Sequence, residues 1–243
     1  MSDLLDEVLD AYGGTERWSS VRTITAHGRL GGLLPKRFPG NKLARFAVEV
    51  HPAEQRTVLH DFPRTGQRGV FDHGQVRRES HDGEVIDVRA DPRSAFFGLS
   101  GIRRNLHWDP LDTIYFAGYA FWNYLTAPHL LAHDGVVVSD GGPCQTSGRP
   151  WRRLLATFPA DISTHCRQQT FYVDPGGLIG RHDFLAEPVG SWANATLYCS
   201  RYRHIDGIVF PAQRRVLPRG PRGVVLARPT LLALDFDEIA VGH

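Results

Sequence analysis

Apolar residues follow a helical spacing at the start of the chain and short alternating runs after it. Positions 4, 5, 8, 9 and 12 form one apolar stripe, which predicts a helix over residues 3–12 that ends at Gly13-Gly14. Runs with strand character follow, separated by clusters rich in Pro, Gly, Asp and His, as expected of an antiparallel meander. The first group of runs covers residues 21–30, 43–51, 56–62, 69–71, 75–79 and 84–89.

The middle of the chain has a different pattern. Residues 111–125 contain only three polar residues, Asp112, Thr113 and Asn123. Asp109 is suited to cap the first turn of a helix, and Pro110 suits its first position. A helix that is apolar nearly all round is normally buried on several sides. We therefore expect a buried helix that is rich in aromatic residues.

Strand patterns return after this helix. The runs are residues 136–139, 152–158, 168–173, 178–186, 193–202, 208–217 and 224–237. Asp-Gly and Pro-Gly-Gly sequences between consecutive runs predict tight turns. We find no repeat and no linker, so we expect a single domain over residues 1–243. The predicted fold is α+β: one strongly curved antiparallel β-sheet, a half-barrel, wrapped over the buried apolar helix, with an N-terminal helix.

Composition narrows the range of functions. The chain has 243 residues and a formal net charge of +2, with scattered basic residues, so we do not expect nucleic-acid binding. The longest apolar stretch, residues 114–125, is far below the ~18 residues that suggest a spanning helix, so no membrane insertion is expected. The acidic N-terminus lacks the layout of a secretory signal, which predicts a cytoplasmic protein.

Three groups of residues carry a resemblance to a known fold. They are Ala11-Tyr12-Gly13-Gly14 with Trp18, the segment from Phe171 to Leu178, and the segment from His204 to Pro211. Together they resemble the lipoprotein-carrier fold of LolA, LolB and LppX. In that fold a curved antiparallel sheet half-closes around an apolar cavity covered by helices. The resemblance implies a carrier that binds a hydrophobic ligand.

A second resemblance concerns uncharacterised cytoplasmic bacterial proteins of actinobacterial type with the same shape. It rests on the aromatic sequence around Tyr115 and Tyr119, on the sequence Trp122-Asn123-Tyr124-Leu125-Thr126, and on Arg181-His182-Asp183. Those relatives imply no reaction.

Aromatic residues in and near the central helix are the candidate ligand-binding residues. Aromatic rings provide large contact areas, and the polar ends of Tyr and Trp orient a ligand. The alternative is that they pack against the concave face of the sheet. Buried tyrosine hydroxyls need partners, which favours a cavity. The candidates are Trp108, Tyr115, Tyr119, Trp122, Tyr124 and Phe184.

Candidate proton-transfer residues come from the strands. If Arg181 and Asp183 form an ion pair on the outer face, His182 faces inward beside Phe184, where it is either a general acid–base or a hydrogen-bonded core residue. His165, Tyr172 and Tyr198 are the further candidates, and the face that carries Tyr198 suits either solvent or a wet cavity. No metal-ligand spacing and no nucleotide motif is present, so we expect neither a metal nor a cofactor.

Three functions fit these features. The first is a cofactor-independent cyclase, isomerase or dehydratase of secondary metabolism, such as antibiotic biosynthesis, that acts on a polyketide- or terpenoid-like intermediate. The second is a non-catalytic carrier or sensor of a lipid or hydrophobic metabolite. The third is an interaction module in which the aromatic helix is ordinary core. We rank the enzyme first, with a hydrophobic small molecule as its partner.

Overall fold

The computed structural model describes residues 3–39, 43–98, 107–146 and 148–243. Its helices include α1 (Asp3–Ala11), α2 (Thr15–Ser19) and α4 (Pro110–Thr126). The first six strands are β1 (Thr23–Gly31), β2 (Arg45–His51), β3 (Arg56–His60), β4 (Gln67–Asp72), β5 (Gln75–Ser80) and β6 (Val85–Arg89). The remaining strands are β7 (Val137–Thr146), β8 (Arg149–Thr157), β9 (Gln168–Val173), β10 (Ile179–Leu185), β11 (Asn194–Ile205), β12 (Ile208–Pro218) and β13 (Leu232–Gly242).

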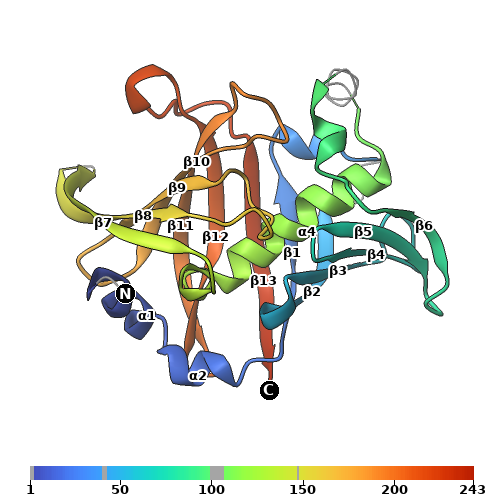
Figure 1. Ribbon diagram of the computed structural model, residues 1–243, viewed down its shortest axis with the longest axis horizontal. Coiled ribbons are helices and arrows are strands. Elements are labelled where there is room, and N and C mark those ends of the chain that lie inside the picture. Colours follow the sequence, from blue (N-terminus) through green and yellow to red (C-terminus); the bar gives the residue numbers. More distant parts are fainter. Residues whose placement is uncertain (1–2, 40–42, 99–106, 147) are drawn as a thin grey trace.

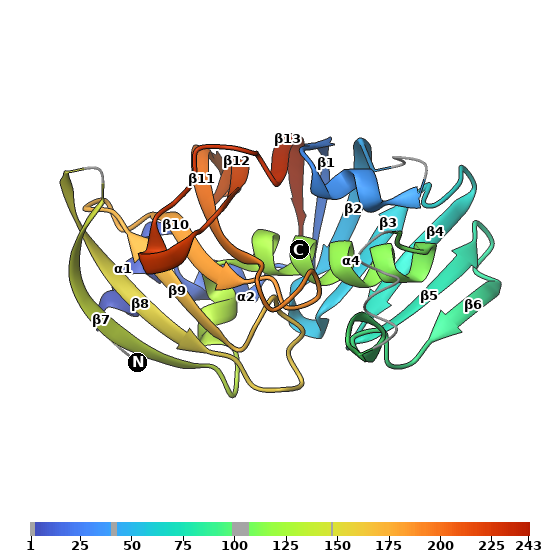
Figure 2. The same ribbon diagram turned by 90° about the horizontal axis from the view of Figure 1, so that it is seen from above.

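All thirteen strands belong to one antiparallel sheet in the order β6-β5-β4-β3-β2-β1-β13-β12-β11-β10-β9-β8-β7. The first and last strands of the chain, β1 and β13, pair at its centre, whereas β6 and β7 form its two edges. The sheet is therefore open. It curves so that both edges come forward around α4, which lies across its concave face (Figure 1; Figure 2). This confirms the predicted curved sheet with a helix and an N-terminal helix.

The central helix agrees with its prediction. Asp109 accepts a hydrogen bond from the backbone N–H of Asp112, and the Asp112 side chain accepts one from the backbone N–H of Asp109, which makes a capping box. Every helical residue after Pro110 is buried, so α4 is covered on all sides. None of the described helices is long and apolar enough to cross a lipid bilayer.

Two glycines allow α4 to lie close to the sheet. A Cβ atom on Gly118 would lie 2.3 Å from the Cβ atom of Phe71 on β4, and one on Gly69 would lie 2.5 Å from the Cγ1 atom of Ile114. Thr57 on β3 also donates a hydrogen bond to the carbonyl oxygen of Gly118 over 2.9 Å. These contacts fix the first part of the helix over β3 and β4. The C-terminal end of the helix faces β10–β12.

One predicted strand begins in the wrong place. The run over residues 224–237 was expected to be continuous, but β13 starts only at Leu232 and extends to Gly242. Pro229 has no backbone N–H to contribute to a ladder, and residues 219–231 form a loop between β12 and β13. Beyond residue 237 the strand is extended by pairing with β1, in which Thr23 lies opposite Gly242. The short helix α2 was not predicted either.

The segments that carry the resemblance meet at one corner of the molecule. The backbone N–H of Val209 donates to the carbonyl oxygen of Tyr12, and the Tyr12 hydroxyl accepts a hydrogen bond from the backbone N–H of Ile179. Gly13 has a φ of 112°, and a Cβ atom there would lie 2.3 Å from the carbonyl oxygen of Gly207. The end of α1 is therefore attached to the turns before β10 and β12.

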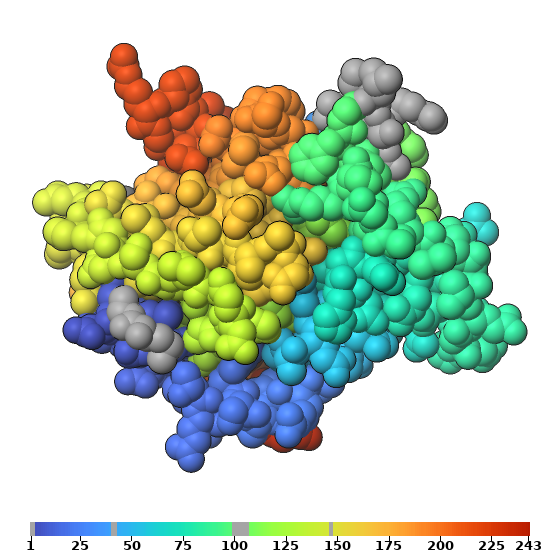
Figure 3. Space-filling model, in the orientation of Figure 1, coloured from blue at the N-terminus to red at the C-terminus, as the bar shows by residue number. Residues whose placement is uncertain are grey.

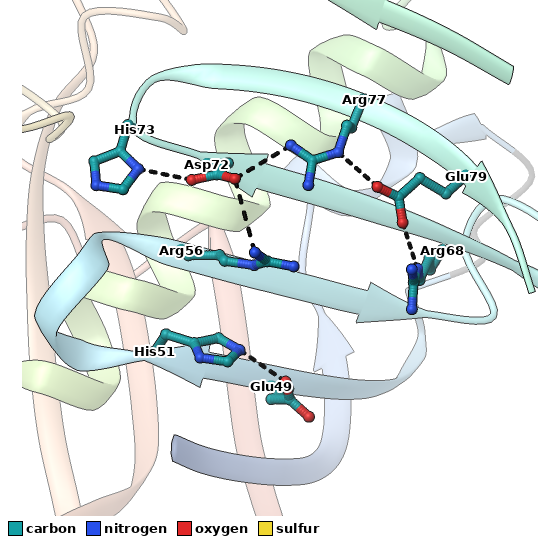
Figure 4. Close-up of polar contacts among 8 residues, drawn as sticks. All are labelled: Glu49, His51, Arg56, Arg68, Asp72, His73, Arg77 and Glu79. Atoms are coloured by element: carbon teal, nitrogen blue, oxygen red, sulfur yellow. Dashed lines mark hydrogen bonds and ion pairs between the residues drawn. The ribbon is translucent and has the colours of Figure 1, made fainter. Parts of the chain in front are cut away.

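The convex face of strands β2–β5 carries polar side chains that pair with one another (Figure 4). Asp72 lies 3.2 Å from Arg77 and 2.7 Å from His73. Glu79 accepts hydrogen bonds over 2.5 Å from both Arg68 and Arg77. Val48, Leu59 and Phe71 of these strands belong to the core beneath α4, whereas Val58 and Val70 are covered by the polar side chains of the outer face.

Candidate functional site

A cavity of about 500 Å³ opens on the concave side of the sheet, between α4 and strands β10–β12. This volume lies within the range of roughly 300–1,000 Å³ that is usual for small-molecule sites. Most of its lining is apolar. The lining residues are Leu33, Leu34, Arg37, Phe116, Tyr124, His165, Phe184, Ala186, Val189, Trp192, Ala193, Asn194, Ala195, Val216, Pro218, Arg219, Gly220, Leu226, Pro229, Leu231 and Leu232.

Four rings meet at the inner end of this cavity. Phe116 and Tyr124 come from α4, Phe184 from β10 and His165 from the segment before β9. His165 is fully buried, and its ring centroid lies 4.1 Å from that of Phe184 with the planes inclined by 10°. The Tyr119 hydroxyl lies 3.1 Å from His165 Nδ1, and the Tyr124 hydroxyl lies 3.1 Å from Nε2.

His165 is held in its neutral form. Burial lowers its pKa well below the ordinary value, and nearby His182 and Arg93 lower it further. A neutral imidazole has one N–H donor and one acceptor nitrogen, so one tyrosine hydroxyl donates to the ring and the other accepts from it. The inner end of the cavity is therefore apolar or neutral, with its polar groups already paired.

The mouth of the cavity is formed by three segments that lie at the same edge of the molecule. They are the short 3-10 helix Leu34–Arg37, residues 186–193, and the loop over residues 219–231. In the space-filling view, residues 186–193 and the loop between β12 and β13 lie next to each other at the upper edge (Figure 3). Leu33, Trp192 and Leu226 line the mouth, although 44%, 68% and 47% of their surfaces are exposed.

His182 is a hydrogen-bonded core residue. As predicted, Arg181 and Asp183 form an ion pair of 2.7 Å on the outer face, and His182 points inward. Its Nε2 atom lies 2.6 Å from the Gln169 side-chain oxygen, and its ring stacks on Phe171 at 4.1 Å. The adjacent void has a volume of about 30 Å³, which suits a water molecule and no organic substrate.

The protonation state of His182 follows from its neighbours. The Gln169 amide nitrogen donates to the carbonyl oxygen of Cys166 over 2.7 Å, so the amide oxygen faces His182 and Nε2 carries the hydrogen. Burial lowers the pKa of His182 to about 3, although the Asp183 carboxylate raises it in part. The ring is neutral near pH 7 and fixed as a donor, so the proposed general acid–base role does not fit.

The two strand tyrosines lie on the face away from the cavity. The Tyr172 hydroxyl donates to Asp183 over 3.0 Å, and its ring lies under the Arg181 guanidinium. Tyr198 is opposite Arg181 in the β10–β11 pairing and therefore shares that outer face. Neither tyrosine lines the cavity, so the structure does not bring these two candidate catalytic residues to it.

Only two of the six candidate ligand-binding residues, Tyr124 and Phe184, line the cavity. Trp108 packs against Phe38, Phe96 and Phe116, and Tyr119 reaches His165.

Tyr115 and Trp122 lie elsewhere as well. Arg93 donates to the Tyr115 hydroxyl over 3.1 Å, and the Trp122 indole donates to the carbonyl oxygen of His51. These two side chains border a separate, more polar surface hollow. Because α4 is covered on all sides, most of its rings meet other parts of the core.

Sequence reasoning missed most of the lining. Three buried residues of the lining leave space because their side chains are small: Ala186, Ala193 and Ala195. The loop between β12 and β13 supplies Leu226 and Pro229. Small residues in the strand opposite Phe184 are a signal in the sequence for empty space beside that ring. Alternation in residues 193–202 places Ala195 on one face with Leu197, and pairing puts Ala195 opposite Phe184.

Comparisons with known proteins define the fold. No family profile and no curated protein matches the chain. A DUF1329 family protein from Desulfovibrio piger matches with a TM-score of 0.54 and 15% identity, over 98% of this chain and 91% of that one. A LolA superfamily protein from Nitrosomonas europaea matches with a TM-score of 0.55 and 12% identity, over 98% and 92%. An outer membrane lipoprotein-sorting protein domain from Vibrio parahaemolyticus gives 0.51 and 10%, over 98% and 93%.

These matches confirm the fold of the resemblance and correct the predicted activity. Two of the three solved structures are named as a LolA superfamily protein and a lipoprotein-sorting protein domain, the third is named as a DUF1329 family protein, and none of the three is named as an enzyme. Of the four proposed catalytic residues only His165 lines the cavity, whereas His182, Tyr172 and Tyr198 do not. The prediction of a cyclase, isomerase or dehydratase in antibiotic biosynthesis or other secondary metabolism is therefore wrong. The third predicted function, an interaction module in which the aromatic helix is ordinary core, does not fit either, because the cavity is present.

Proposed function

We propose that the protein binds a lipid or another hydrophobic molecule in this cavity and carries it without chemical change. The observation that carries the proposal is a largely apolar cavity of about 500 Å³ that ends on Phe184 and a neutral His165. Burying apolar surface of a ligand there contributes roughly 25 cal/mol per Å². The lipoprotein-sorting name of the Vibrio parahaemolyticus structure supports carriage over a reaction.

The first test asks whether a ligand is bound. Protein purified from cells is extracted with chloroform and methanol, and the extract is analysed by mass spectrometry. The delipidated protein is then titrated with the neutral fluorophore N-phenylnaphthylamine. We expect a co-purified apolar compound and saturable fluorophore binding. A protein that neither yields a compound nor binds the fluorophore would overturn the proposal.

Ala195→Phe tests whether the ligand occupies this cavity. Ala195 is buried on β11 opposite Phe184, so the new ring fills the inner end of the space. We expect the affinity for the fluorophore to fall about ten-fold or more. Val137→Phe is the matched control, because Val137 is exposed on the edge strand β7 and should leave binding unchanged. Ala193→Phe, nearer the mouth, repeats the test if Ala195→Phe melts at a lower temperature.

A further inference from the structure

The charged side chains that line the cavity are all cationic. Arg37 and Arg219 line it, whereas no Asp or Glu of the described residues does. The one histidine in the lining, His165, is neutral for the reasons given above. A purely apolar ligand would gain nothing from these two guanidinium groups, and a cationic ligand would be repelled by them.

Arg37 has unused hydrogen-bonding capacity. It is the last residue of the 3-10 helix Leu34–Arg37, and its Nη1 atom is buried without a hydrogen-bond partner. Burial also lowers the pKa of this guanidinium. Leaving a buried donor of a charged group unpaired is unfavourable, and a bound anion would remove that penalty.

Arg219 is only partly paired. Its Nη2 atom donates to the Asn194 side-chain oxygen over 3.3 Å. Its Nε atom lies 3.9 Å from the nearer Asp183 oxygen, beyond hydrogen-bond distance, and is buried without a hydrogen-bond partner. Asp183 is itself bonded to Arg181, Thr196 and Tyr172, so its charge is shared among several groups. Because Asn194 and Asp183 lie on the outer face of β10 and β11, the Arg219 guanidinium lies at the rim of the mouth and its free donor is directed away from the inner end of the cavity.

The two arginines and the apolar surface lie at different ends of the cavity. Arg37 and Arg219 belong to the segments that form the mouth, whereas Phe116, Tyr124 and Phe184 form the inner end. This arrangement, with charged groups at the mouth and apolar rings at the inner end, matches a molecule with a charged head and an apolar tail. The tail would contact the aromatic rings, and the head would remain at the mouth beside the Arg37 guanidinium.

We propose that the ligand is an anionic amphiphile whose carboxylate or phosphate head is bound by Arg37 at the mouth of the cavity. The inference rests on the proposed carrier function and adds the chemical class of the ligand. Guanidinium groups bind both kinds of oxyanion through paired N–H donors, so the shared chemistry is an oxygen anion on an apolar chain. Neutral hydrocarbons and cationic amphiphiles are the classes that this site disfavours.

The test compares four probes with the same apolar chain. Palmitate, monohexadecyl phosphate, hexadecanol and hexadecyltrimethylammonium compete with N-phenylnaphthylamine on delipidated protein, below the concentrations at which they form micelles. We expect both anions to bind about ten-fold tighter than the alcohol, and the cation to bind weakest. A difference between palmitate and the phosphate ester identifies which head the site prefers.

Single substitutions test which residues cause the preference for anionic probes. Arg37→Gln should reduce the affinity for the preferred anion about ten-fold while leaving the affinity for hexadecanol unchanged, whereas Arg219→Gln should change the affinity for the anion by less than about three-fold. Arg222→Gln and Arg228→Gln are the matched controls, because both arginines lie in the same exposed loop and do not line the cavity. Thermal melting confirms that each variant is folded before its affinities are compared.

The outcomes separate this inference from the proposed function. If hexadecanol and the anions bind equally well, the head-group inference is overturned and the carrier function stands. If the anions bind best but Arg222→Gln weakens them as much as Arg37→Gln, the assigned residue is wrong. If no probe displaces the fluorophore and the fluorophore itself does not bind, the carrier function fails first.

Discussion

His165 and Phe184 lie face to face at the inner end of the cavity, with ring centroids 4.1 Å apart and planes inclined by 10°. His165 comes from the segment before β9 and Phe184 from β10, so the stacked pair joins two parts of the chain at the cavity end. Both imidazole nitrogens are paired with buried tyrosine hydroxyls. The histidine therefore closes the cavity with an uncharged surface.

Replacing His165 with Phe should destabilise the protein although the stacking is retained. The substitution leaves the hydroxyls of Tyr119 and Tyr124 buried without their partner, at a cost of about 2 kcal/mol or more in the free energy of unfolding. Urea unfolding followed by circular dichroism measures this cost.

His129→Phe is the matched control. His129 is also buried and stacks on Trp18 at 4.2 Å, but both of its ring nitrogens lack a hydrogen-bond partner. Removing them should leave the free energy of unfolding unchanged or raise it by up to about 1 kcal/mol. Equal losses in the two variants would show that the tyrosine contacts do not stabilise the fold.

Stability should fall as the pH is lowered below about 6.5, because several histidines are buried in neutral form. Burial lowers the pKa of His129 from 6.5 to about 4 and that of His182 to about 3. Between these values and pH 6.5 the unfolded chain binds more protons than the folded protein, so protonation favours unfolding. The stabilisation is complete above pH 6.5 and is lost progressively below it.

His129→Phe also tests this linkage. The variant lacks one proton-binding group, so the dependence of the unfolding free energy on pH should be shallower by up to about 1.4 kcal/mol per pH unit between roughly pH 4 and pH 6.5. Urea unfolding at a series of pH values gives both slopes. Parallel curves for wild type and variant would show that His129 titrates normally in the folded state.

The sequence predicts the elements well because their signals are local. The apolar stretch over residues 111–125 lies within α4, and the predicted cap, Asp109, forms its capping box. Alternation around Arg181 and Asp183 predicts an inward-facing His182, which the structure confirms. Two-residue turns also follow from local chemistry, since Asp206 and Gly207 adopt the positive φ angles that a tight hairpin needs.

The cavity was harder to predict because empty space depends on long-range pairing. The apolar pattern over residues 108–125 shows that Trp108 and Tyr115 are near a core, but not whether a void or another ring lies beside them. Ala195 contributes space only because it lies opposite Phe184. The strand pattern over residues 224–231 does not show that this segment leaves the sheet and forms the mouth.

Gly118→Ala should destabilise the protein although alanine is the better helix former. The new Cβ atom would lie 2.3 Å from that of Phe71, so α4 would have to move away from β4. We expect a loss of about 2 kcal/mol, which exceeds the gain of roughly 1 kcal/mol in helix propensity. Gly31→Ala is the control, because a Cβ atom there would meet only Ala233 at 3.9 Å. A Gly118→Ala protein as stable as wild type would show that this close approach is not required.

Trp192 should report ligand binding at the mouth. It is 68% exposed, whereas Trp108 and Trp122 are almost fully buried before any ligand arrives. A ligand that covers the Trp192 ring transfers it from water to an apolar contact, so tryptophan emission should shift to shorter wavelength during a palmitate titration. Trp192→Phe should abolish most of this shift and change the affinity by no more than about three-fold. Trp151→Phe, which replaces an indole outside the cavity lining, should keep the shift. A shift that persists in Trp192→Phe would place the ligand away from this mouth, and the assignment of residues 186–193 to the binding site would fail with it.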